Sequence, residues 1–307
     1  MKKILITGIN GFIGQNLRKV LSAVYDVYGL DITKLEEDNK IIEVDITNMS
    51  KIEEKLRNST FDYVIHCAAI AHNDKKQFSE KTLIDVNVNG TRNLLEFFKK
   101  KPPKAFIFFS SVAVYGEYGV NSYIDENKNL SPNTIYGKTK VQGEQLCNDS
   151  EINTIILRFP VIYSEIMLKD LKKRLIGVEK MGRIFLFKFG NGKQKHVFCH
   201  IESVNNIVRF ILENYKKLKK NVFQAGDDFY YTSNDLLKYF KSKRNKTISI
   251  FLPSWMLKVL LTLMSLMFPE KRFFYQSIYW KLTKNNLYSI EKLKLMKYVS
   301  KDQARLL

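Results

Sequence analysis

Short apolar runs, each ending in glycine, alanine or a small polar residue, recur along the first part of the chain. They cover residues 3–7, 26–30, 41–44, 64–69 and 106–111. Runs of this length are typical of buried strands, and the segment that follows the first run, to about residue 23, has the period of an amphipathic helix. The pattern predicts an α/β chain in which strands and helices alternate.

Three glycines, Gly8, Gly11 and Gly14, lie between the first predicted strand and its helix. Glycine permits a sharp turn and a close approach of the backbone, so the unpaired N–H groups of the helix N-terminus can face a pyrophosphate. Asp31 follows the second strand at about the twenty-residue spacing of a dinucleotide fold. Because a carboxylate there accepts hydrogen bonds from an adenosine ribose and repels a 2′-phosphate, we expect NAD(H) to be favoured over NADP(H).

The ends of the later strands carry residues that suit a ligand site. Asp45 follows the third run, Ala68 and Ala69 end the fourth, and Ser111 ends the fifth. In open α/β sheets, ligands bind beyond the carboxyl ends of the strands. The sequence therefore predicts a cofactor site at this edge of the sheet.

Tyr136 and Lys140 lie four residues apart, so one helical turn places both side chains on the same face. Hydride transfer at a carbinol carbon needs a base for the hydroxyl proton, or an acid in the reverse direction, and a free tyrosine has a pKa of about 10. A nearby ammonium is expected to lower the pKa of Tyr136. Ser111 would hydrogen-bond the reacting oxygen. The pair alone is typical of a solvated helix face, but with Ser111 and the glycine turn it indicates a redox enzyme.

In these motifs the chain resembles the extended short-chain dehydrogenase/reductase family, in the NAD-dependent epimerase/dehydratase branch that modifies nucleotide sugars. The resemblance covers nearly the whole length, and its residues are Gly8, Gly11, Gly14, Asp31, Asp45, Ile46, Ala68, Ala69, Asn87, Ser111, Tyr136 and Lys140. It implies a Rossmann-type doubly wound parallel sheet over residues 1–163. It also implies a smaller mixed α/β substrate-binding domain over residues 164–307, with the chain crossing back between the two.

The resemblance also implies roles for individual residues. Catalysis would fall to Ser111, Tyr136 and Lys140. The cofactor would be held by Gly8, Asn10, Gly11, Phe12, Ile13, Gly14, Asp31, Asp45, Ile46, Ala68, Ala69, Asn87, Tyr136 and Lys140. The substrate contacts would include Arg158 and His196, the latter at the place of an arginine that usually grips the substrate diphosphate.

Departures from the family pattern narrow the reaction. Nucleotide-sugar 4,6-dehydratases have an Asp-Glu pair directly after the active-site hydroxyl residue, where this chain has Val112 and Ala113. Neither side chain can move a proton, which argues against dehydration. Val112 also replaces the cysteine that the fucose-synthase branch needs for epimerisation beside a ketone. The remaining reaction is redox chemistry at C4 of a sugar, carried out by a 4-epimerase or by a 4-ketoreductase.

The choice between these two depends on the substrate contacts. Val161 stands where many 4-epimerases have an asparagine, and Ser203 stands at the place of an expected aspartate. Residues 226–231 and 246–253 are similar to capsule and O-antigen reductases, so we expect reduction of a UDP-4-keto-6-deoxy-N-acetylhexosamine in surface polysaccharide biosynthesis. Asp31 favours the alternative, an NAD-dependent UDP-glucose or UDP-N-acetylglucosamine 4-epimerase, because dissociating reductases often use NADPH. NADP(H) therefore stays open as a cofactor.

Two other classes of function are also open. One is a reductase of the same superfamily that acts on a non-sugar alcohol, although residues 87–91 and Arg158 match the sugar branch. The other is a non-catalytic NAD(P)-binding regulatory protein. The regulatory alternative is weakened by the intact set of Ser111, Tyr136 and Lys140, since non-enzymatic relatives can lose the base.

The amino-acid composition indicates which binding partners and which cellular compartment to expect. The net charge of +19 attracts anions, including nucleotide sugars, but no nucleic-acid recognition motif accompanies it. Three widely spaced cysteines, Cys67, Cys147 and Cys199, argue against a disulfide framework and for a reducing cytoplasm. The four histidines, His66, His72, His196 and His200, lack metal-ligand spacing, so we expect no metal site.

The stretch from Trp255 to Phe268 is apolar apart from Lys258, Thr262 and Ser265. It is short of the roughly 20 residues that span a bilayer as a helix. We expect a helix that packs in the substrate domain or at the contact of a homodimer. The alternative is peripheral contact of this stretch with a membrane, where flanking Trp280 and nearby lysines would suit anionic lipid.

Overall fold

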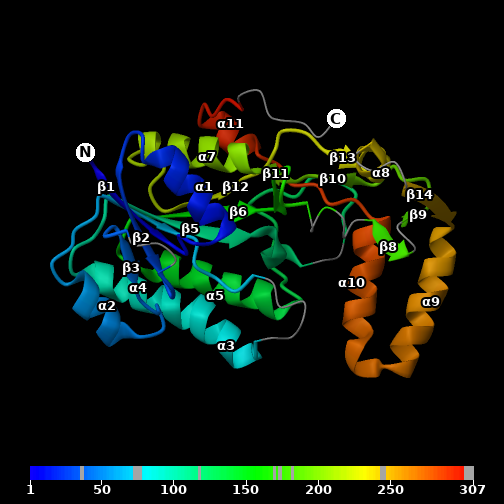
Figure 1. Cartoon of the computed structure of the whole chain (residues 1–307), viewed down its shortest axis with the longest axis horizontal. Helices are drawn as coiled ribbons and strands as arrows, with labels where there is room; N and C mark the ends of the chain where they lie inside the picture. Colours follow the sequence, from blue (N-terminus) through cyan, green and yellow to red (C-terminus); the bar gives the residue numbers. More distant parts are fainter. Residues whose placement is uncertain are drawn as a thin grey trace.

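The fold is described from a computed structural model, which covers residues 1–34, 38–71, 78–116, 119–168, 171, 175–180, 183–242 and 247–300. A seven-stranded parallel sheet forms its largest part (Figure 1). Its strands, in spatial order, are β12 (Asn221–Gln224), β6 (Thr154–Phe159), β5 (Ala105–Ser111), β4 (Tyr63–His66), β1 (Lys3–Thr7), β2 (Asp26–Asp31) and β3 (Ile41–Glu43). The order reverses direction between β1 and β4, as in a doubly wound sheet. The predicted Rossmann-type fold class is confirmed.

Both faces of the sheet are covered by helices, which explains why its strands read as continuous apolar runs. One face packs α1 (Phe12–Leu21), α7 (Ile201–Asn214) and α11 (Glu291–Leu295), and Figure 1 shows these three on the same side. The other face packs α2 (Met49–Leu56), α4 (Gly90–Lys99) and α5 (Ile135–Asp149). Neighbouring strand residues alternate between the two cores, because successive side chains point to opposite faces.

Short helical elements connect the strands near the carboxyl ends of β4 and β5. They are α3 (Glu80–Ile84), the π-helical turn η1 (Asp85–Asn89) and the 3₁₀ turn η2 (Val112–Tyr115). η1 runs directly into α4, and η2 follows β5 without a break. These elements line up with the edge of the sheet at which the sequence predicts the cofactor site.

The chain leaves the large sheet near residue 163 and returns to it twice. β12 adds the seventh strand beside β6, with Phe223 opposite Leu157, and α11 later packs near β12. α7 packs against α1 on the same face. The division into two domains at residue 163 stays a prediction, since elements from both halves of the chain share one core.

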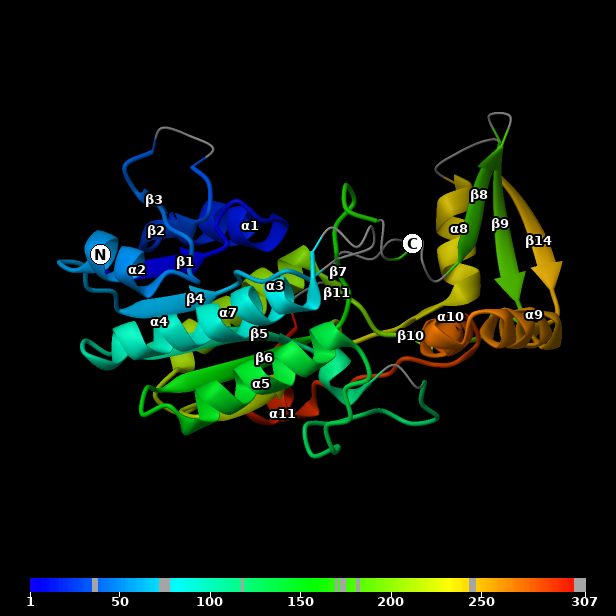
Figure 2. The ribbon, with the colours of Figure 1, turned by 90° about the horizontal axis from the view of Figure 1, so that it is seen from below.

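The remaining elements form a smaller unit beside the large sheet (Figure 2). Its three-stranded sheet has the order β14 (Thr247–Leu252), β9 (Arg183–Phe189) and β8 (Ile176–Lys180), with one parallel and one antiparallel pairing. The helices of this unit are α8 (Ser233–Ser242), α9 (Ser254–Met267) and α10 (Arg272–Thr283), the last two joined by the 3₁₀ turn η3 (Pro269–Lys271). Two short pairs link the units: β7 (Ile162–Tyr163) with β11 (Cys199–His200), and β10 (Lys195–His196) with β13 (Tyr231–Thr232).

Candidate functional site

The glycine turn between β1 and α1 has no room for side chains. Gly8 has a φ of +70°, which side chains rarely adopt, and a Cβ at Gly8 would lie 2.8 Å from the backbone nitrogen of Ala68. A Cβ at Gly14 would collide with the Gly8 carbonyl oxygen. The turn therefore brings the start of α1 against the ends of β1 and β4, as a pyrophosphate cradle requires.

The N-terminus of α1 is open to a ligand. Gly11 is its N-cap residue and has no side chain that could occupy the capping position. The first N–H groups of a helix have no intrahelical partner, so they and the positive end of the helix dipole can receive a phosphate. Phe12 and Ile13 pack partly against the core beneath this turn, and the Asn10 side chain donates to the Thr33 carbonyl oxygen at 2.6 Å.

Asp31 lies at the end of β2, directly beside the glycine turn. One carboxylate oxygen accepts from the Asn10 backbone N–H at 2.9 Å, and the other accepts from the Ile32 N–H at 2.8 Å. These bonds hold the carboxylate next to the phosphate cradle, at the place of an adenosine ribose in a dinucleotide fold. The residues present therefore fit a dinucleotide with a free 2′-hydroxyl.

Asp45 and Ile46 line the loop after β3. The Asp45 carboxylate accepts from the Thr47 N–H at 2.9 Å, which closes a turn. Ile46 is buried and packs against Gly90, where a Cβ would lie 2.6 Å from the Ile46 side chain. Ile46 therefore supports the loop from below, while Asp45 is half-buried at its surface.

Asn87 ties the end of β4 to α5. Its side chain accepts from the Ile70 N–H at 2.8 Å, donates to the Ile70 carbonyl at 3.1 Å, and donates to the Thr139 hydroxyl at 3.1 Å. It is almost fully buried. The structure thus gives Asn87 a supporting position for the half-buried Ala68 and Ala69 loop, and its direct contact with a cofactor stays a prediction.

Ser111, Tyr136 and Lys140 come together where β5 ends and α5 begins. Thr134 caps α5 by accepting from the Gly137 N–H at 3.0 Å. A Cβ at Gly137 would lie 2.6 Å from the Ala113 carbonyl oxygen, so glycine is what lets α5 approach η2 this closely. The approach brings the Tyr136 hydroxyl into a hydrogen bond with the Ser111 side chain.

Lys140 lies beneath the tyrosine, in an almost fully buried position. Its Nζ donates to the Phe109 carbonyl oxygen at 2.8 Å and lies 5.8 Å from the centre of the Tyr136 ring. The three predicted catalytic residues therefore form one cluster. In this cluster the Ser111 hydroxyl, the Tyr136 phenol and the Lys140 ammonium lie together at the carboxyl edge of the sheet.

Burial dominates the electrostatics of this cluster. It raises the pKa of Tyr136 to about 12, although the hydrogen bond with Ser111 lowers it. It also lowers the pKa of Lys140 to about 8, against the opposing influence of Cys67, Cys147 and Glu144. Lys140 is not among the groups that shift the pKa of Tyr136 here, so the expectation that its ammonium lowers this pKa stays a prediction. Tyr136 is a protonated phenol here, ready to donate a proton.

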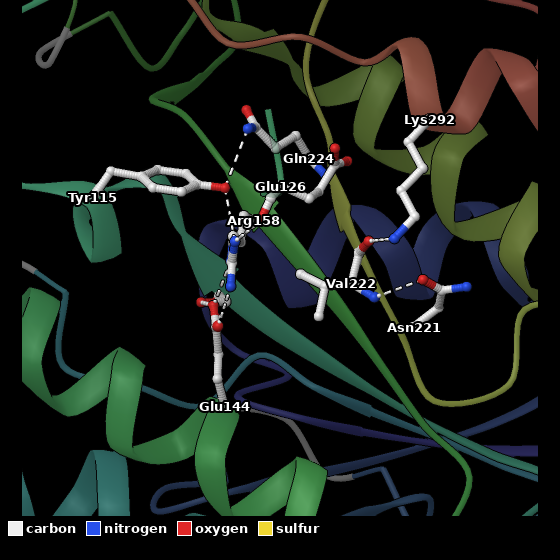
Figure 3. A network of polar contacts seen from close by, with 9 residues as sticks. Tyr115, Glu126, Glu144, Arg158, Asn221, Val222, Gln224 and Lys292 are labelled. Carbon is white, nitrogen blue, oxygen red and sulfur yellow. Dashed lines mark hydrogen bonds and ion pairs between the residues drawn. The ribbon is translucent and has the colours of Figure 1, made fainter. Parts of the chain in front are cut away.

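Arg158 occupies the core rather than an open substrate surface (Figure 3). Its guanidinium forms an ion pair with both oxygens of the Glu144 carboxylate, at 2.9 and 2.6 Å. It also donates to the Tyr115 hydroxyl at 2.7 Å and lies 5.1 Å from the centre of that ring. Glu144 further accepts from the Ser110 hydroxyl at 2.5 Å. With its donors used in this way, Arg158 is placed to support the site, and its contact with substrate stays a prediction.

The network around Arg158 was not predicted from the sequence, although a signal was present. Tyr136, Lys140 and Glu144 repeat at intervals of four residues along α5, so they share one helix face. Gln224 closes the network from β12 by donating to the Tyr115 hydroxyl at 3.1 Å. Figure 3 shows Glu144, Arg158 and Gln224 converging from α5, β6 and β12.

His196 also lies in the interior, with no exposed surface. One ring nitrogen shares a hydrogen bond with the Ser233 hydroxyl at 3.2 Å, and the other lies 3.3 Å from the Asn286 side-chain nitrogen. The ring stacks on Phe198 at a centroid distance of 6.0 Å. The structure therefore does not place His196 in an open position for a substrate diphosphate, and the predicted contact has no support in this conformation.

The remaining histidines that the structure describes have local partners. His66 is held between the Thr7 hydroxyl at 2.6 Å and the Thr91 hydroxyl at 2.9 Å, and burial lowers its pKa to about 3. His200 caps α7 by accepting from the Glu202 N–H. His72 lies outside the described residues. Among those described, no three His, Cys, Asp or Glu side chains gather as ligands for a metal ion.

Comparisons with known proteins find relatives along most of the chain. The sequence model described as "NAD dependent epimerase/dehydratase family" matches residues 4–226. A UDP-glucose 4-epimerase of Vibrio cholerae is 30% identical over 271 residues, which cover 84% of this chain and 79% of that protein. An N-acetyl-alpha-D-glucosaminyl-diphospho-ditrans,octacis-undecaprenol 4-epimerase of Escherichia coli O157:H7 is 30% identical over 263 residues, covering 81% of this chain and 75% of the relative.

Solved structures give the same result. A UDP-glucuronic acid 4-epimerase from Bacillus cereus in complex with NAD superposes with a TM-score of 0.63 at 26% identity, covering 82% of this chain and 87% of that one. A UDP-Glc/GlcNAc 4-epimerase from Campylobacter jejuni superposes with a TM-score of 0.68 at 22% identity, covering 82% of this chain and 87% of that one. The second likeness shows the fold alone.

Proposed function

Because the chain belongs to the NAD-dependent epimerase/dehydratase family, we propose that it exchanges a hydride and a proton at C4 of a sugar carried on a diphosphate. The observation that carries the proposal is the cluster of Ser111, Tyr136 and Lys140 at the carboxyl edge of the sheet, beside a glycine turn whose backbone closely approaches the ends of β1 and β4. NAD(H), the cofactor of this family, supplies the hydride chemistry when bound. The predicted family and NAD(H) cofactor are confirmed.

Each residue of the cluster has its own role in the proposed reaction. The Tyr136 phenol donates its proton to a sugar ketone oxygen and becomes a phenolate, and in the opposite direction the phenolate accepts the hydroxyl proton. The Ser111 hydroxyl orients the reacting oxygen and stabilises the charge that develops on it. Lys140, anchored to the Phe109 carbonyl, places a positive charge beneath the phenol and favours the phenolate that forms when the proton leaves.

We propose 4-epimerisation as the first candidate reaction. Val112 and Ala113 supply no acid or base for elimination, so the cluster supports oxidation and reduction only. Asp31 fits a tightly held NAD, which an epimerase uses without net consumption. The relatives from Vibrio cholerae and Escherichia coli, each 30% identical over most of the chain, are both named 4-epimerases. We therefore prefer the epimerase to the reductase that the sequence favoured.

The reductase is the second candidate, because the substrate contacts depart from those of many 4-epimerases. Val161 stands at the place of a substrate-binding asparagine, and His196 replaces an arginine and is buried. In this alternative the enzyme reduces a UDP-4-keto-6-deoxy-N-acetylhexosamine in surface polysaccharide biosynthesis. A cytoplasmic location and a homodimer are part of the proposal in either case.

One experiment separates these candidates. Purified protein is incubated with UDP-glucose or UDP-N-acetylglucosamine without added cofactor, and in parallel with the 4-keto sugar and NADH or NADPH, and the sugar products are followed by NMR. An epimerase equilibrates the C4 epimers without net cofactor use, whereas a reductase consumes one reduced cofactor per keto sugar. A protein that binds NAD but converts neither substrate would be the regulatory alternative. A product lacking the elements of water from an intact UDP-hexose would contradict both reactions.

The same assay can also show whether the sugar is carried on a nucleoside diphosphate or on a lipid diphosphate. One of the two relatives acts on UDP-glucose, and the other on a sugar attached to undecaprenol through a diphosphate. We therefore propose that a lipid-diphosphate-linked N-acetylhexosamine be included beside the UDP-sugars. Turnover of that substrate alone would assign the C4 chemistry to a lipid-linked sugar.

A further inference from the structure

The outer face of α9 is apolar and exposed. Its side chains repeat at intervals of three and four residues and so form a stripe along one side of the helix. We call this the α9 stripe, and its members are Trp255, Met256, Val259, Leu260, Leu263, Leu266 and Met267. Leu266 and Met267 each expose 71% of their surface, and Trp255 exposes 65%. This face of the stretch from Trp255 to Phe268 therefore does not pack in the substrate domain, and the other predicted partners, a second copy or a membrane, stay predictions.

The packing face of α9 is a different one. Leu257 and Leu261 are buried in one apolar cluster with Tyr275 and Leu282 of α10 and Phe189 of β9. Lys258, Thr262 and Ser265 separate this buried face from the α9 stripe on one flank. One face of α9 thus packs within the molecule, and a second, wide apolar face stays exposed. An exposed apolar face of this kind indicates a binding partner that covers it.

The hairpin of α9 and α10 stands out from the rest of the molecule (Figure 1). α9 has 14 residues, about 21 Å of helix, which is shorter than the roughly 30 Å of a bilayer hydrocarbon core. In the described part of the chain, every helix is too short or too polar to cross a membrane. Glu270, Lys271 and Arg272 lie at the turn of the hairpin, and three charged side chains there oppose insertion of the tip.

The charges of the hairpin are mainly positive. Between Ser254 and Lys284 there are five basic residues (Lys258, Lys271, Arg272, Lys281 and Lys284) and one acidic residue, Glu270. Lys271 lies over the half-exposed ring of Phe268, with its Nζ 5.3 Å from the ring centre. An apolar stripe with an aromatic residue at each end and basic residues around it is complementary to the surface of a bilayer that contains anionic lipid.

We propose that the α9–α10 hairpin docks on the surface of an anionic phospholipid bilayer, with α9 lying in the plane of the interface and the α9 stripe facing the acyl chains. A second copy of the chain fits this surface less well. A two-fold interface would bring the same patch of each copy together, and each hairpin carries a charge excess of the same sign. A bilayer with negative headgroups complements that charge instead.

The base of the hairpin is joined to the chain that leads away from the catalytic strand. The Val120 N–H donates to the Asn285 carbonyl at 3.0 Å, and the Ile124 N–H donates to the Leu287 carbonyl at 3.0 Å. Residues 119–124 thus connect the end of α10 to the segment after η2. A docked hairpin would hold this side of the molecule near the bilayer, where a lipid-linked sugar would be met.

Flotation of the whole protein with vesicles tests the proposal. We expect it to float with vesicles of phosphatidylcholine mixed with phosphatidylglycerol, and much less with phosphatidylcholine alone. Replacing Val259, Leu263 and Leu266 together by serine should lower the bound fraction at least about tenfold, because burying one such side chain is worth more than the free energy of a tenfold change. A matched control replaces Val24, Leu295 and Val299 by serine, since these exposed side chains lie outside the hairpin.

The control variant should float as the wild type does. Equal binding of both triple variants and the wild type, or equal loss in both variants, would overturn the proposal. Lys271→Glu combined with Arg272→Glu should weaken flotation with the anionic vesicles and reduce its sensitivity to salt. Loss of binding in none of the hairpin variants would mean that another surface, drawn by the overall charge, holds the vesicles.

Tryptophan fluorescence provides a second readout that keeps the α9 stripe intact. The chain has two tryptophans, Trp255 and Trp280, so Trp280→Phe leaves Trp255 as the reporter. We expect its emission to shift to shorter wavelength on addition of anionic vesicles and to be quenched by brominated lipid. An unchanged spectrum would contradict docking through α9. A dimer in solution that the serine triple variant converts to a monomer, without any vesicle binding, would assign the surface to a second copy.

Discussion

Arg158 and Glu144 form a buried ion pair in which two guanidinium nitrogens meet the two carboxylate oxygens, at 2.9 and 2.6 Å. β6 supplies the arginine, and α5 supplies the glutamate one helical turn after Lys140. The pair therefore joins the sheet to the helix that carries the catalytic tyrosine and lysine. We therefore expect the pair to stabilise the fold and to hold α5 in position on the sheet.

Arg158→Met should lower the free energy of unfolding by about 3–5 kcal/mol, because it leaves the Glu144 carboxylate buried without its counter-charge. Replacing both residues by methionine should cost much less, since no buried charge is then left alone. Urea denaturation of the two variants measures the difference. If the double replacement is as costly as the single one, the pair is not what stabilises this contact.

The same variants test the predicted contact of Arg158 with substrate. In the protein that remains folded, the double methionine variant should keep a KM close to that of the wild type, because the guanidinium faces Glu144 and Tyr115. A large rise in KM without loss of stability would instead return Arg158 to the substrate site.

The strands and the catalytic residues could be predicted because their signals are local. Apolar runs mark strands that are buried on both faces, and Gly8, Tyr136 and Lys140 belong to motifs whose spacing is fixed by one turn or one helix. The ion pair of Arg158 could not be predicted in this way. Its geometry depends on how α5 packs on β6, which sequence spacing does not encode.

Two other features of the fold could not be predicted from the sequence either. β12 is a short run, Asn221–Gln224, that becomes the seventh strand only because β6 leaves an open edge beside it. The stretch from Trp255 to Phe268 is apolar on nearly every side, so its composition does not say which face packs. The pKa of Tyr136 likewise depends on how much water the fold excludes, and burial raises it despite the opposing influence of Ser111.

Asp31→Ala should shift the cofactor preference toward NADP(H). The carboxylate lies beside the glycine turn, held by the Asn10 N–H, and its removal takes away both a ribose acceptor and a charge that repels a 2′-phosphate. We expect the ratio of kcat/KM for NADP(H) to that for NAD(H) to rise at least about tenfold, which corresponds to 1.4 kcal/mol.

Asp31→Asn is the matched variant for this prediction, since it keeps an oxygen acceptor but removes the charge. A partial shift is expected for Asn and a larger one for Ala. If neither substitution changes the ratio in steady-state assays with both cofactors, another group distinguishes the ribose.

Asp227 predicts a pH dependence of stability. Its buried carboxylate accepts from the His200 N–H, the Ser203 hydroxyl and the Tyr163 hydroxyl, yet burial raises its pKa to about 6. In an unfolded chain an aspartate titrates at about 4, so between these values the folded protein binds more protons. The contribution of Asp227 to the free energy of unfolding should therefore fall by about 3 kcal/mol in total, from its full value below about pH 4 to nothing well above about pH 6, with about 2 kcal/mol of the loss between these two pH values.

The comparison with Asp227→Asn isolates this contribution, because the other titrating groups are common to both proteins. Urea unfolding at several pH values should show the wild type losing stability relative to the variant as the pH rises through this window. A difference between the two proteins that is constant with pH would mean that the carboxylate titrates at its ordinary value in the folded state.

Tyr136→Phe should lower kcat at least about a hundredfold, the usual cost of losing general acid–base catalysis, while NAD binding stays near that of the wild type. The substitution removes the hydroxyl that meets Ser111, but it leaves α5, its Thr134 cap and the glycine turn unchanged. Turnover is followed by NMR of the sugar, and NAD binding by calorimetry. Tyr115→Phe is the matched control, because its hydroxyl serves the Arg158 network and should affect stability more than kcat. A Tyr136→Phe rate within tenfold of the wild type would assign the proton transfer to another group.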